Sequence, residues 1–168
     1  PHPRAVLQQV WQRSCEQGFY NIMLPEAIGG AGLSVSDLCA VKEATVLTGS
    51  MLAPHILGEL SGPPRIGHLF KVASPTQIEA FLQPVCRAEK AVCFALTESE
   101  AGSDATAIKT SARREGEHYV LNGTKRYISG APYADIAVLL AVTDPGRGAQ
   151  GISAFFVDLS ASGVRVES

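Results

Sequence analysis

The apolar residues of this chain change their spacing near residue 91. Before that point they recur every three or four positions, as on one side of a helix, beginning with Val6, Leu7, Val10 and Trp11, with Ser14 on the same side. After it they alternate with polar residues or form short runs bounded by turns, which is typical of strands. The change predicts an α+β protein, with an N-terminal all-α domain over residues 1–90 and a β domain over residues 91–168.

The first part carries three helix signals. Gly18 is expected to end a first helix, and Ser34-Val-Ser-Asp37 has the form of a capping box that starts a second, ended by Gly49. Ser74-Pro-Thr-Gln77 starts a third, which Pro84 should limit. Residues 51–70 form a weaker helical segment that three prolines interrupt. The residues expected to face inward are Leu38, Val41 and Thr45 in the second helix and Ile78, Phe81 and Leu82 in the third.

The second part contains seven candidate strands, at residues 91–96, 109–114, 118–121, 124–129, 136–142, 152–157 and 164–167. Asn122-Gly123 between two of them predicts a hairpin with a type I′ turn. Leu121 would then pair with Thr124, and Tyr127 and Ser129 would share one face of a strand while Ile128 is buried. Closely spaced strands of this kind predict an antiparallel barrel or sandwich-like domain.

Composition excludes several classes of function. The net charge is -2 with no basic stripe, so a nucleic-acid partner is not expected. The longest apolar run, residues 136–142, is far shorter than the roughly 20 residues that span a membrane. Four cysteines without C-x-x-C spacing and four scattered histidines predict no metal site. The cysteines are interpreted as buried small hydrophobes in a reducing compartment.

The stretch ALTESEAGSD, residues 95–104, is the clearest candidate for a ligand-binding loop. Thr97, Ser99 and Ser103 offer hydroxyls, and residues 101–103 could converge their backbone N–H groups into an anion-binding nest. Such a loop suits a ligand with a polar ring near Thr97 and a phosphate near Ser103. The alternative is a solvated loop with local Ser and Asp turns, because its carboxylates would repel a phosphate.

This stretch resembles the flavin-loop motif of the acyl-CoA dehydrogenase family, an apolar residue followed by T-E-P-x-A-G-S-D. The segment LNGTKRYISGA resembles the family's second motif, and LPEAIGGAGLSVSD resembles its N-terminal motif. The segment ASPTQIEAFLQPVCRAEKAVCFALTE is similar to the helix that leads into the family's middle domain. The resemblance covers almost the whole chain in the family's order.

The resemblance implies an FAD site on the β domain. Thr97 would bond the pyrimidine side of the flavin ring, Gly102 and Ser103 would meet the phosphates, and Ser103 would also lie beside the acyl-CoA. The residues that would border the cofactor are Phe94, Ala95, Leu96, Thr97, Gly102, Ser103, Tyr127, Ile128 and Ser129. Four positions depart from the usual family residues: Phe94 for Tyr, Ser99 for Pro, Tyr127 for Trp and Ser129 for Thr.

The activity that the resemblance implies is oxidation of an acyl-CoA thioester to the 2,3-enoyl-CoA. The catalytic base is expected in a C-terminal helical domain that this chain is expected to lack, so no catalytic residue is assigned here and the chain alone is expected to be inactive. Expected partners are acyl-CoA, an electron-transfer flavoprotein or similar acceptor, and further copies in a tetramer or dimer. The expected location is the cytoplasm, or the mitochondrial matrix in a eukaryote. An acyl-CoA oxidase, a flavin-dependent monooxygenase and a non-catalytic binding module remain as alternatives.

Overall fold

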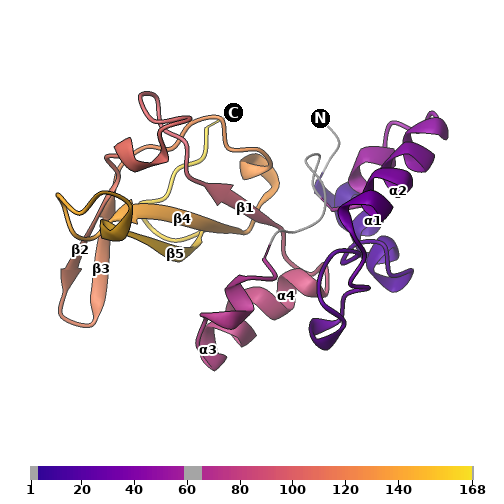
Figure 1. Cartoon of the computed structure of the whole chain (residues 1–168), viewed down its shortest axis with the longest axis horizontal. Helices are drawn as coiled ribbons and strands as arrows, with labels where there is room; N and C mark the ends of the chain where they lie inside the picture. The colour runs from indigo at the N-terminus through magenta and orange to yellow at the C-terminus, as the bar shows by residue number, and fades with distance from the viewer. Residues whose placement is uncertain (1–3, 59–65, 168) are drawn as a thin grey trace. The chain divides into compact units, whose positions relative to one another are not determined.

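The computed structural model describes residues 4–58 and 66–167 (Figure 1). The chain divides into two compact units, Pro1–Ala91 and Val92–Ser168. The first is helical and the second is built on one sheet. Residues 59–65, in the middle of the segment predicted to be weakly helical, lie outside the described residues.

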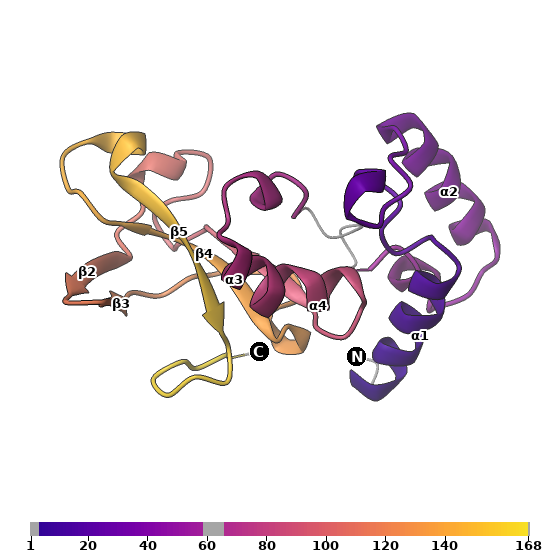
Figure 2. The same cartoon turned by 90° about the horizontal axis from the view of Figure 1, so that it is seen from below.

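The helical unit contains α1 (Arg4–Glu16), α2 (Val35–Leu47), and a third helical stretch made of three consecutive parts (Figures 1 and 2). Those parts are α3 (Pro75–Gln77), a π-helical turn (Ile78–Leu82) and α4 (Gln83–Cys86). Short 3₁₀ turns at Glu26–Ile28, Ala53–His55 and Leu69–Lys71 connect them.

The predicted helix starts are confirmed by their hydrogen bonds. Ser34 and Asp37 form a complete capping box, in which the Asp37 amide donates to Ser34 Oγ at 3.2 Å and the Ser34 amide donates to Asp37 Oδ2 at 2.9 Å. Ser74 and Gln77 form a second box in the same way. Gly18 and Gly49 follow their helices with φ of +79° and +68°, as C-terminal glycines do.

The prediction that Pro84 limits the third helix is wrong, since the helix continues to Cys86. A proline inside an α-helix lacks an N–H and crowds the carbonyl four residues earlier. Here the π turn ends at Leu82, two residues before the proline, and the Gln83 amide donates to Ile78 O, five residues back. The wider turn changes the hydrogen-bonding register, so the chain passes Pro84 without ending the helix.

The inward faces of the helices agree with their apolar spacing. Leu7, Trp11 and Ser14 of α1 are buried, and Leu38, Val41 and Thr45 are half-buried in a helix that is otherwise largely exposed. Trp11 Nε1 donates to Gly58 O at 2.5 Å, which satisfies the indole inside the core. The other large buried side chains of this unit are Tyr20, Ile22, Leu24, Leu57, Ile66, Leu69, Leu82 and Val85.

The β unit is organised around β4 (Ile136–Val142), which Figure 1 shows between β1 (Val92–Ala95) and β5 (Ile152–Asp158). β1 pairs with the first half of β4 in parallel, and β5 pairs antiparallel along its whole length. β2 (Ser111–Glu115) meets β4 in parallel at Ser111 and Val142, and β3 (His118–Asn122) pairs antiparallel with β2.

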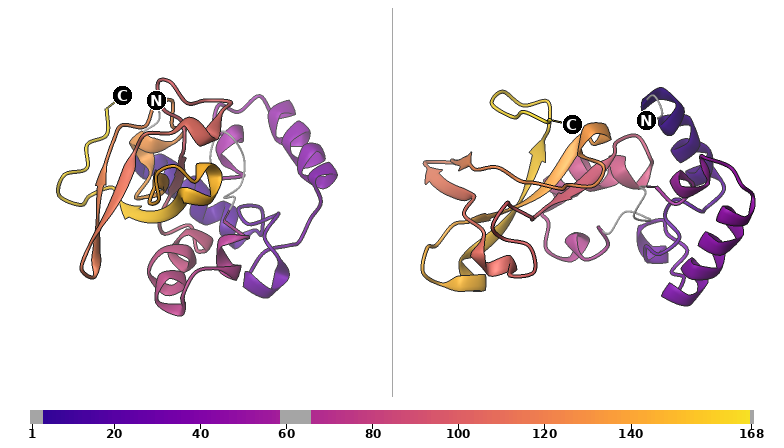
Figure 3. Two further views of the ribbon diagram at one scale, coloured as in Figure 1. Left: turned by 60° about the vertical axis from the view of Figure 1, so that its left-hand side comes forward. Right: turned by 90° about the horizontal axis from the view of Figure 1, so that it is seen from above.

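The α+β class is confirmed, but the sheet is mixed and open where an antiparallel barrel was predicted. The reason is the connection from β1 to β4. Residues 96–135 carry the chain through loops and the β2–β3 hairpin before it returns to β1 in the same direction, and a parallel pair needs a long crossover of this kind. Figure 3 shows the hairpin extending away from β4.

The predicted hairpin turn is in the wrong place. Glu115 pairs with His118, so the turn is Gly116-Glu117, with Gly116 at φ +61°. Gly123 instead lies against Thr110, where a Cβ would come within 2.4 Å of Thr110 Oγ1. The glycine therefore allows a close approach between two segments, and residues 124–129 form no strand. Residues 164–167 also form none, whereas the other five predicted strands are present within a few residues of their expected bounds.

A small apolar cluster lies beneath the end of β1. Cys93 and Ala95 pack with Ala137 of β4, and Ile128, Leu139 and Val157 pack around them. The interpretation of all four cysteines as buried is wrong, because Cys93 is buried but Cys15 and Cys86 are half-buried and Cys39 is exposed on α2. None of the helices in the described part of the chain combines the length and apolar character that crossing a membrane requires.

Candidate functional site

The loop after β1 turns back on itself within four residues. The Glu98 amide donates to Ala101 O at 3.0 Å and the Ala101 amide donates to Glu98 O at 3.4 Å, so residues 98–101 close a tight turn. Before the turn, Phe94 is exposed, Ala95 is buried, and Leu96 and Thr97 are half-buried. After it, Gly102 and Ser103 are exposed. The predicted ligand residues of this segment thus lie on both arms of one turn.

The second predicted segment, residues 124–130, reaches this loop without being a strand. The Arg126 amide donates to Thr97 O at 2.8 Å, which fixes the two segments beside each other. Tyr127 has φ +57°, a left-handed conformation that is strained for an aromatic residue, and the residue is 85% exposed. Ile128 packs against the Cys93 cluster and Ser129 is exposed.

The register predicted for this segment is therefore wrong. Tyr127 and Ser129 do not alternate along a strand, because the backbone reverses its handedness at Tyr127. The structure does turn Ile128 toward the β core, as expected, and leaves its two neighbours exposed.

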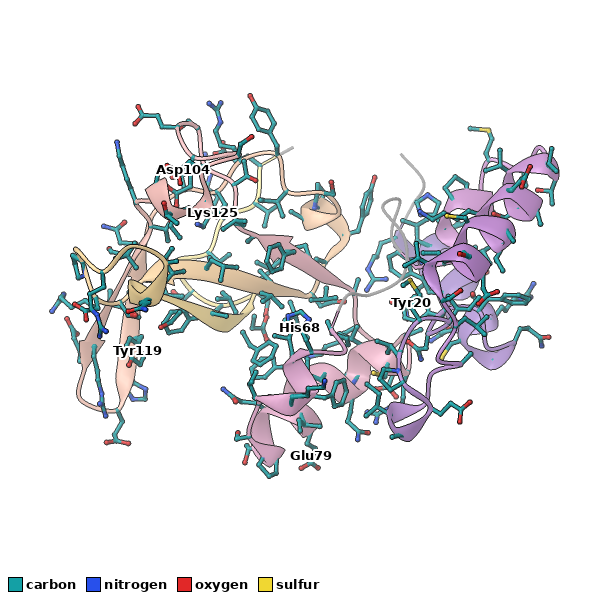
Figure 4. The ribbon with its side chains drawn as sticks, viewed as in Figure 1. Tyr20, His68, Glu79, Asp104, Tyr119 and Lys125 are labelled. Carbon is teal, nitrogen blue, oxygen red and sulfur yellow. The ribbon has the colours of Figure 1, made fainter. Side chains whose placement is uncertain are left out.

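A buried ion pair joins the two segments. Lys125 Nζ lies 2.8 Å from Glu98 Oε1 and donates to Leu96 O at 2.9 Å, and the two side chains are only 8% and 9% exposed. The Glu98 carboxylate also accepts from the Lys109 amide at 2.7 Å, the Thr110 amide at 2.9 Å and the Thr110 hydroxyl. Figure 4 shows Lys125 in the loop region at one end of the sheet.

These contacts set the charge state of Glu98. Burial by itself would raise the pKa of the carboxyl group, but the hydrogen bonds from Lys125, Thr110 and Lys109 favour the ionised form. Together they lower the pKa to about 2. Glu98 is therefore a carboxylate at any physiological pH, and its charge is balanced by Lys125.

The other carboxylates of the loop are also occupied. Glu100 lies 2.6 Å from Lys109 Nζ, and Asp104 accepts from the Thr106 amide at 3.0 Å and the Thr106 hydroxyl at 2.6 Å. Hydrogen bonding to these partners lowers the pKa of both groups. The loop carries fewer uncompensated negative charges than its sequence suggests, which weakens the objection that it would repel a phosphate.

The donors of this loop fit a cofactor with a polar ring and a phosphate. Among the described residues, the side-chain hydroxyls of Thr97, Ser103 and Ser129 have no hydrogen-bond partner, and neither do the amides of Gly102 and Ser103. Gly102 has no positive φ, so the expected nest geometry is absent, but a Cβ built there would meet nothing within 4 Å. The fold itself therefore gives no reason for a glycine at this position, whereas a ligand lying against the backbone would.

The buried pair and Thr110 were missed at the level of sequence. Glu98 lies in the ALTESEAGSD motif and Lys125 in the LNGTKRYISGA motif. The presence of opposite charges in the two motifs was the one sequence feature that could have indicated an ion pair between them. Among the described residues, no group of three or more His, Cys, Asp or Glu side chains is placed to hold a metal ion.

Two family models match the chain, one over each unit. The model described as "Acyl-CoA dehydrogenase, N-terminal domain" matches residues 2–89, and "Acyl-CoA dehydrogenase, middle domain" matches residues 93–168.

Curated relatives match nearly all of this chain but less than half of their own length. A 3-(aryl)acrylate reductase from Clostridium sporogenes is 37% identical over 161 residues, covering 94% of this chain and 41% of that protein. The caffeyl-CoA reductase-Etf complex subunit CarC of Acetobacterium woodii is 36% identical, with 94% and 41% covered. The human mitochondrial short-chain specific acyl-CoA dehydrogenase is 35% identical, with 88% and 35% covered.

Solved structures agree with these relatives. An acyl-CoA dehydrogenase from Geobacillus kaustophilus matches with a TM-score of 0.75 and 27% identity, covering 96% of this chain and 41% of that one. A glutaryl-CoA dehydrogenase from Mycobacterium smegmatis, in complex with FADH2, matches with a TM-score of 0.72 and 25% identity, with 93% and 38% covered. The sequence, the two units and their folds agree, and the chain belongs to the acyl-CoA dehydrogenase family.

Proposed function

We propose that this chain supplies the FAD-binding part of an oxidoreductase that oxidises an acyl-CoA thioester to the 2,3-enoyl-CoA. The observation that carries the proposal is the open backbone at Gly102, beside amides and hydroxyls without partners among the described residues. FAD would present a pyrophosphate and a polar ring edge to such a surface. A related glutaryl-CoA dehydrogenase structure contains FADH2.

The proposed contacts divide between the two arms of the site. The Thr97 hydroxyl would donate to the pyrimidine side of the flavin, and Gly102 and Ser103 would hold the pyrophosphate, with Ser103 also beside the acyl-CoA. Tyr127 and Ser129 would border the ring with their exposed side chains, and Ile128 with its backbone. Phe94, Ala95 and Leu96 would border the cofactor where β1 leads into the loop.

Bound FAD would supply the acceptor for the hydride from the β-carbon of the thioester, and this chain's residues would hold and orient its ring. Fixed donors near the pyrimidine edge favour the reduced ring, because negative charge collects there. An aromatic side chain beside the ring excludes water from the reacting centre. Thr97 and Tyr127 are the residues that would perform these two tasks.

The base that removes the α-proton is not assigned to Glu98. A carboxylate with a pKa of about 2, already accepting four hydrogen bonds, is too weak a base for this step. Glu100 and Asp104 are likewise engaged by Lys109 and Thr106. We place the base in a part of the complete protein outside this chain.

The relatives' names suggest the partners of the complete protein. Electrons would pass to an electron-transfer flavoprotein or a similar acceptor, since one relative is named as a subunit of an Etf complex. We further propose that the complete protein is a homo-oligomer, either a tetramer or a dimer. Its proposed location is the cytoplasm or the mitochondrial matrix. One relative of this chain is mitochondrial.

The same site could work in the opposite direction, as a reductase of 2-enoyl thioesters. Two relatives, at 37% and 36% identity, are named as reductases. Oxidation and reduction use the same flavin contacts, so the direction would depend on the electron partner and the substrate.

FAD titration of the complete protein tests the site. The wild type should bind one FAD per chain, and Gly102→Ala should weaken binding by about tenfold or more because its methyl occupies the phosphate's place. Gly67→Ala is the matched control, since its Cβ would make only ordinary contacts and the residue has no positive φ. Equal FAD affinity for wild type and Gly102→Ala would refute the proposed placement, and absence of FAD binding would refute the function.

A further inference from the structure

We propose that Glu98, Lys125 and Thr110 form a positioning clamp that fixes the two ligand-facing segments relative to each other. This inference rests on the proposed function for its ligand, but the clamp itself is a feature of this chain. None of its three side chains is among the residues proposed to touch FAD.

The Glu98–Lys125 ion pair is shielded from water. The side chains of Glu98 and Lys125 are more than nine-tenths buried, and bringing a carboxylate and an ammonium out of water costs several kcal/mol each before pairing offsets it. An apolar pair of similar volume often stabilises a fold as well or better. Stability alone therefore gives a weak reason for a buried ion pair at this place.

The pair connects backbone segments that are far apart in the sequence. Lys125 Nζ holds Leu96 O, and the Glu98 carboxylate holds the amides of Lys109 and Thr110. Three backbone segments, at residues 96–98, 109–110 and 125–126, thus meet at one pair of charges. Hydrogen bonds are directional, so they fix an orientation that apolar contacts would leave adjustable.

The two ligand-facing segments are not held by regular secondary structure. Residues 96–103 and 124–130 belong to no strand, and their direct backbone connection is the bond from the Arg126 amide to Thr97 O. Thr97 lies directly before Glu98, and Tyr127 lies two residues after Lys125. A shift of the pair would therefore move both arms of the site.

The contrast with a neighbouring pair provides a control. Glu100 and Lys109 form an ion pair in the same loop at 2.6 Å, but their side chains are 73% and 75% exposed. An exposed pair of this kind contributes little to a fold and fixes little. Glu100→Gln should leave the site unchanged.

The experiment uses the complete protein and two readouts, amide hydrogen exchange without FAD and FAD affinity with the visible circular dichroism of bound flavin. Glu98→Gln and Lys125→Met should speed exchange at the Arg126 amide, whose acceptor is Thr97 O, and should leave the β4–β5 ladder protected. Both variants should lower the FAD affinity by about tenfold or more and alter the flavin dichroism. The double variant should lose little more FAD affinity than either single variant. Thr110→Val removes one hydrogen-bond donor to Glu98 and leaves the ion pair intact, so it is the variant to use where the others do not fold. It should show a smaller increase in Arg126 exchange and a smaller loss of FAD affinity.

Each outcome decides the proposal. Faster exchange at Arg126 together with weaker FAD binding, with Glu100→Gln unchanged in both, supports the clamp. Unchanged hydrogen exchange at the Arg126 amide overturns the clamp. Faster exchange with wild-type FAD affinity and flavin dichroism also overturns it, because an ion pair that only supports the fold would lower stability without moving the site. If the wild-type protein binds no FAD while the exchange result holds, the proposed function fails and the clamp between the segments stands.

Discussion

Because the Glu98 carboxylate is buried and hydrogen-bonded in its ionised form, the free energy of unfolding should fall as the pH is lowered into the acid range. The pKa of Glu98 falls from an ordinary 4.5 to about 2 on folding, so its ionised form stabilises the folded state above pH 4.5 and this contribution is lost as the pH falls through 2. Each unit of pKa difference corresponds to about 1.4 kcal/mol, which gives a contribution of about 3 kcal/mol. Urea unfolding between pH 6 and pH 2 measures it.

The double variant Glu98→Gln/Lys125→Met isolates this contribution, because the other carboxylates with lowered pKa remain. Its free energy of unfolding should fall less steeply with acid than that of the wild type. Identical slopes for the two proteins would show that Glu98 is not held in its ionised form.

Replacing Tyr127 with Asn should stabilise the fold and weaken FAD binding. Its left-handed backbone costs about 1 kcal/mol, and its exposed ring recovers little of that through the Arg126 guanidinium, 5.8 Å away. Tyr127→Asn should raise the free energy of unfolding by up to about 1 kcal/mol, since Asn tolerates this conformation. FAD affinity should fall, because the aromatic wall is removed.

Thermal unfolding without FAD and FAD titration check the two halves of this prediction. Tyr127→Phe, which keeps the ring and the strain, should match the wild type in both. A loss of stability in Tyr127→Asn would mean that the fold, and not a ligand, requires the tyrosine.

At the residue scale, the sequence pointed to hydroxyls that have no partner among the described residues, but not to the contacts that hold their segments in place. Thr97, Ser103 and Ser129 follow from a motif because motifs record residues around a ligand. The pairing of Glu98 with Lys125 joins residues 27 apart across an irregular loop, and no spacing rule for helices or strands brings them together.

Among the elements, the hairpin shows how a strong local signal can mislead. Asn-Gly is favoured in two-residue turns because both positions accept positive φ. Here Gly116-Glu117 makes the turn, and Gly123 is a glycine because Thr110 leaves no room for a side chain. The long-range contact decides the role of Gly123, and it is invisible in the local sequence.

Gly123→Ala should therefore be much more damaging than Gly116→Asn. The added Cβ would lie 2.4 Å from Thr110 Oγ1 and 2.7 Å from Thr110 Cα, so backbone must move, at a cost of about 1–3 kcal/mol or more. Gly116→Asn should change the free energy of unfolding by less than about 1 kcal/mol, because nothing lies within 4 Å and Asn accepts φ +61°. Chemical denaturation compares the two, and equal losses would contradict the assignment.

The capping box of α2 supports a helix that has little other support. No residue of α2 is fully buried, so its stability depends on its ends more than on packing. Ser34→Ala should lower the free energy of unfolding by about 1 kcal/mol, and Ser34→Thr, which keeps the capping hydroxyl, should retain most of the wild-type value. Helical circular dichroism during urea unfolding measures the difference, and no change in Ser34→Ala would contradict it.

For the molecule as a whole, the change of period near residue 91 predicted the order of a helical part and a β part. It could not predict the direction of the strands. β1 and β4 run parallel because 40 residues of loop and hairpin, 96–135, return the chain to the same end of the sheet. The path of that connection sets the direction in which β1 meets β4, because a parallel pair needs a long crossover and an antiparallel pair does not.

Anaerobic titration of the complete FAD-loaded protein with acyl-CoA thioesters is the most direct test of the proposed function. Oxidation of the thioester should bleach the visible band of the bound flavin, and the 2,3-enoyl-CoA should appear in equal amount. Rapid recovery of the band in air would indicate an oxidase, and bleaching that requires an external reductant, followed by recovery with an enoyl-CoA, would indicate a reductase. A protein that holds one FAD per chain but transfers no electrons to or from any acyl or enoyl thioester would contradict the account.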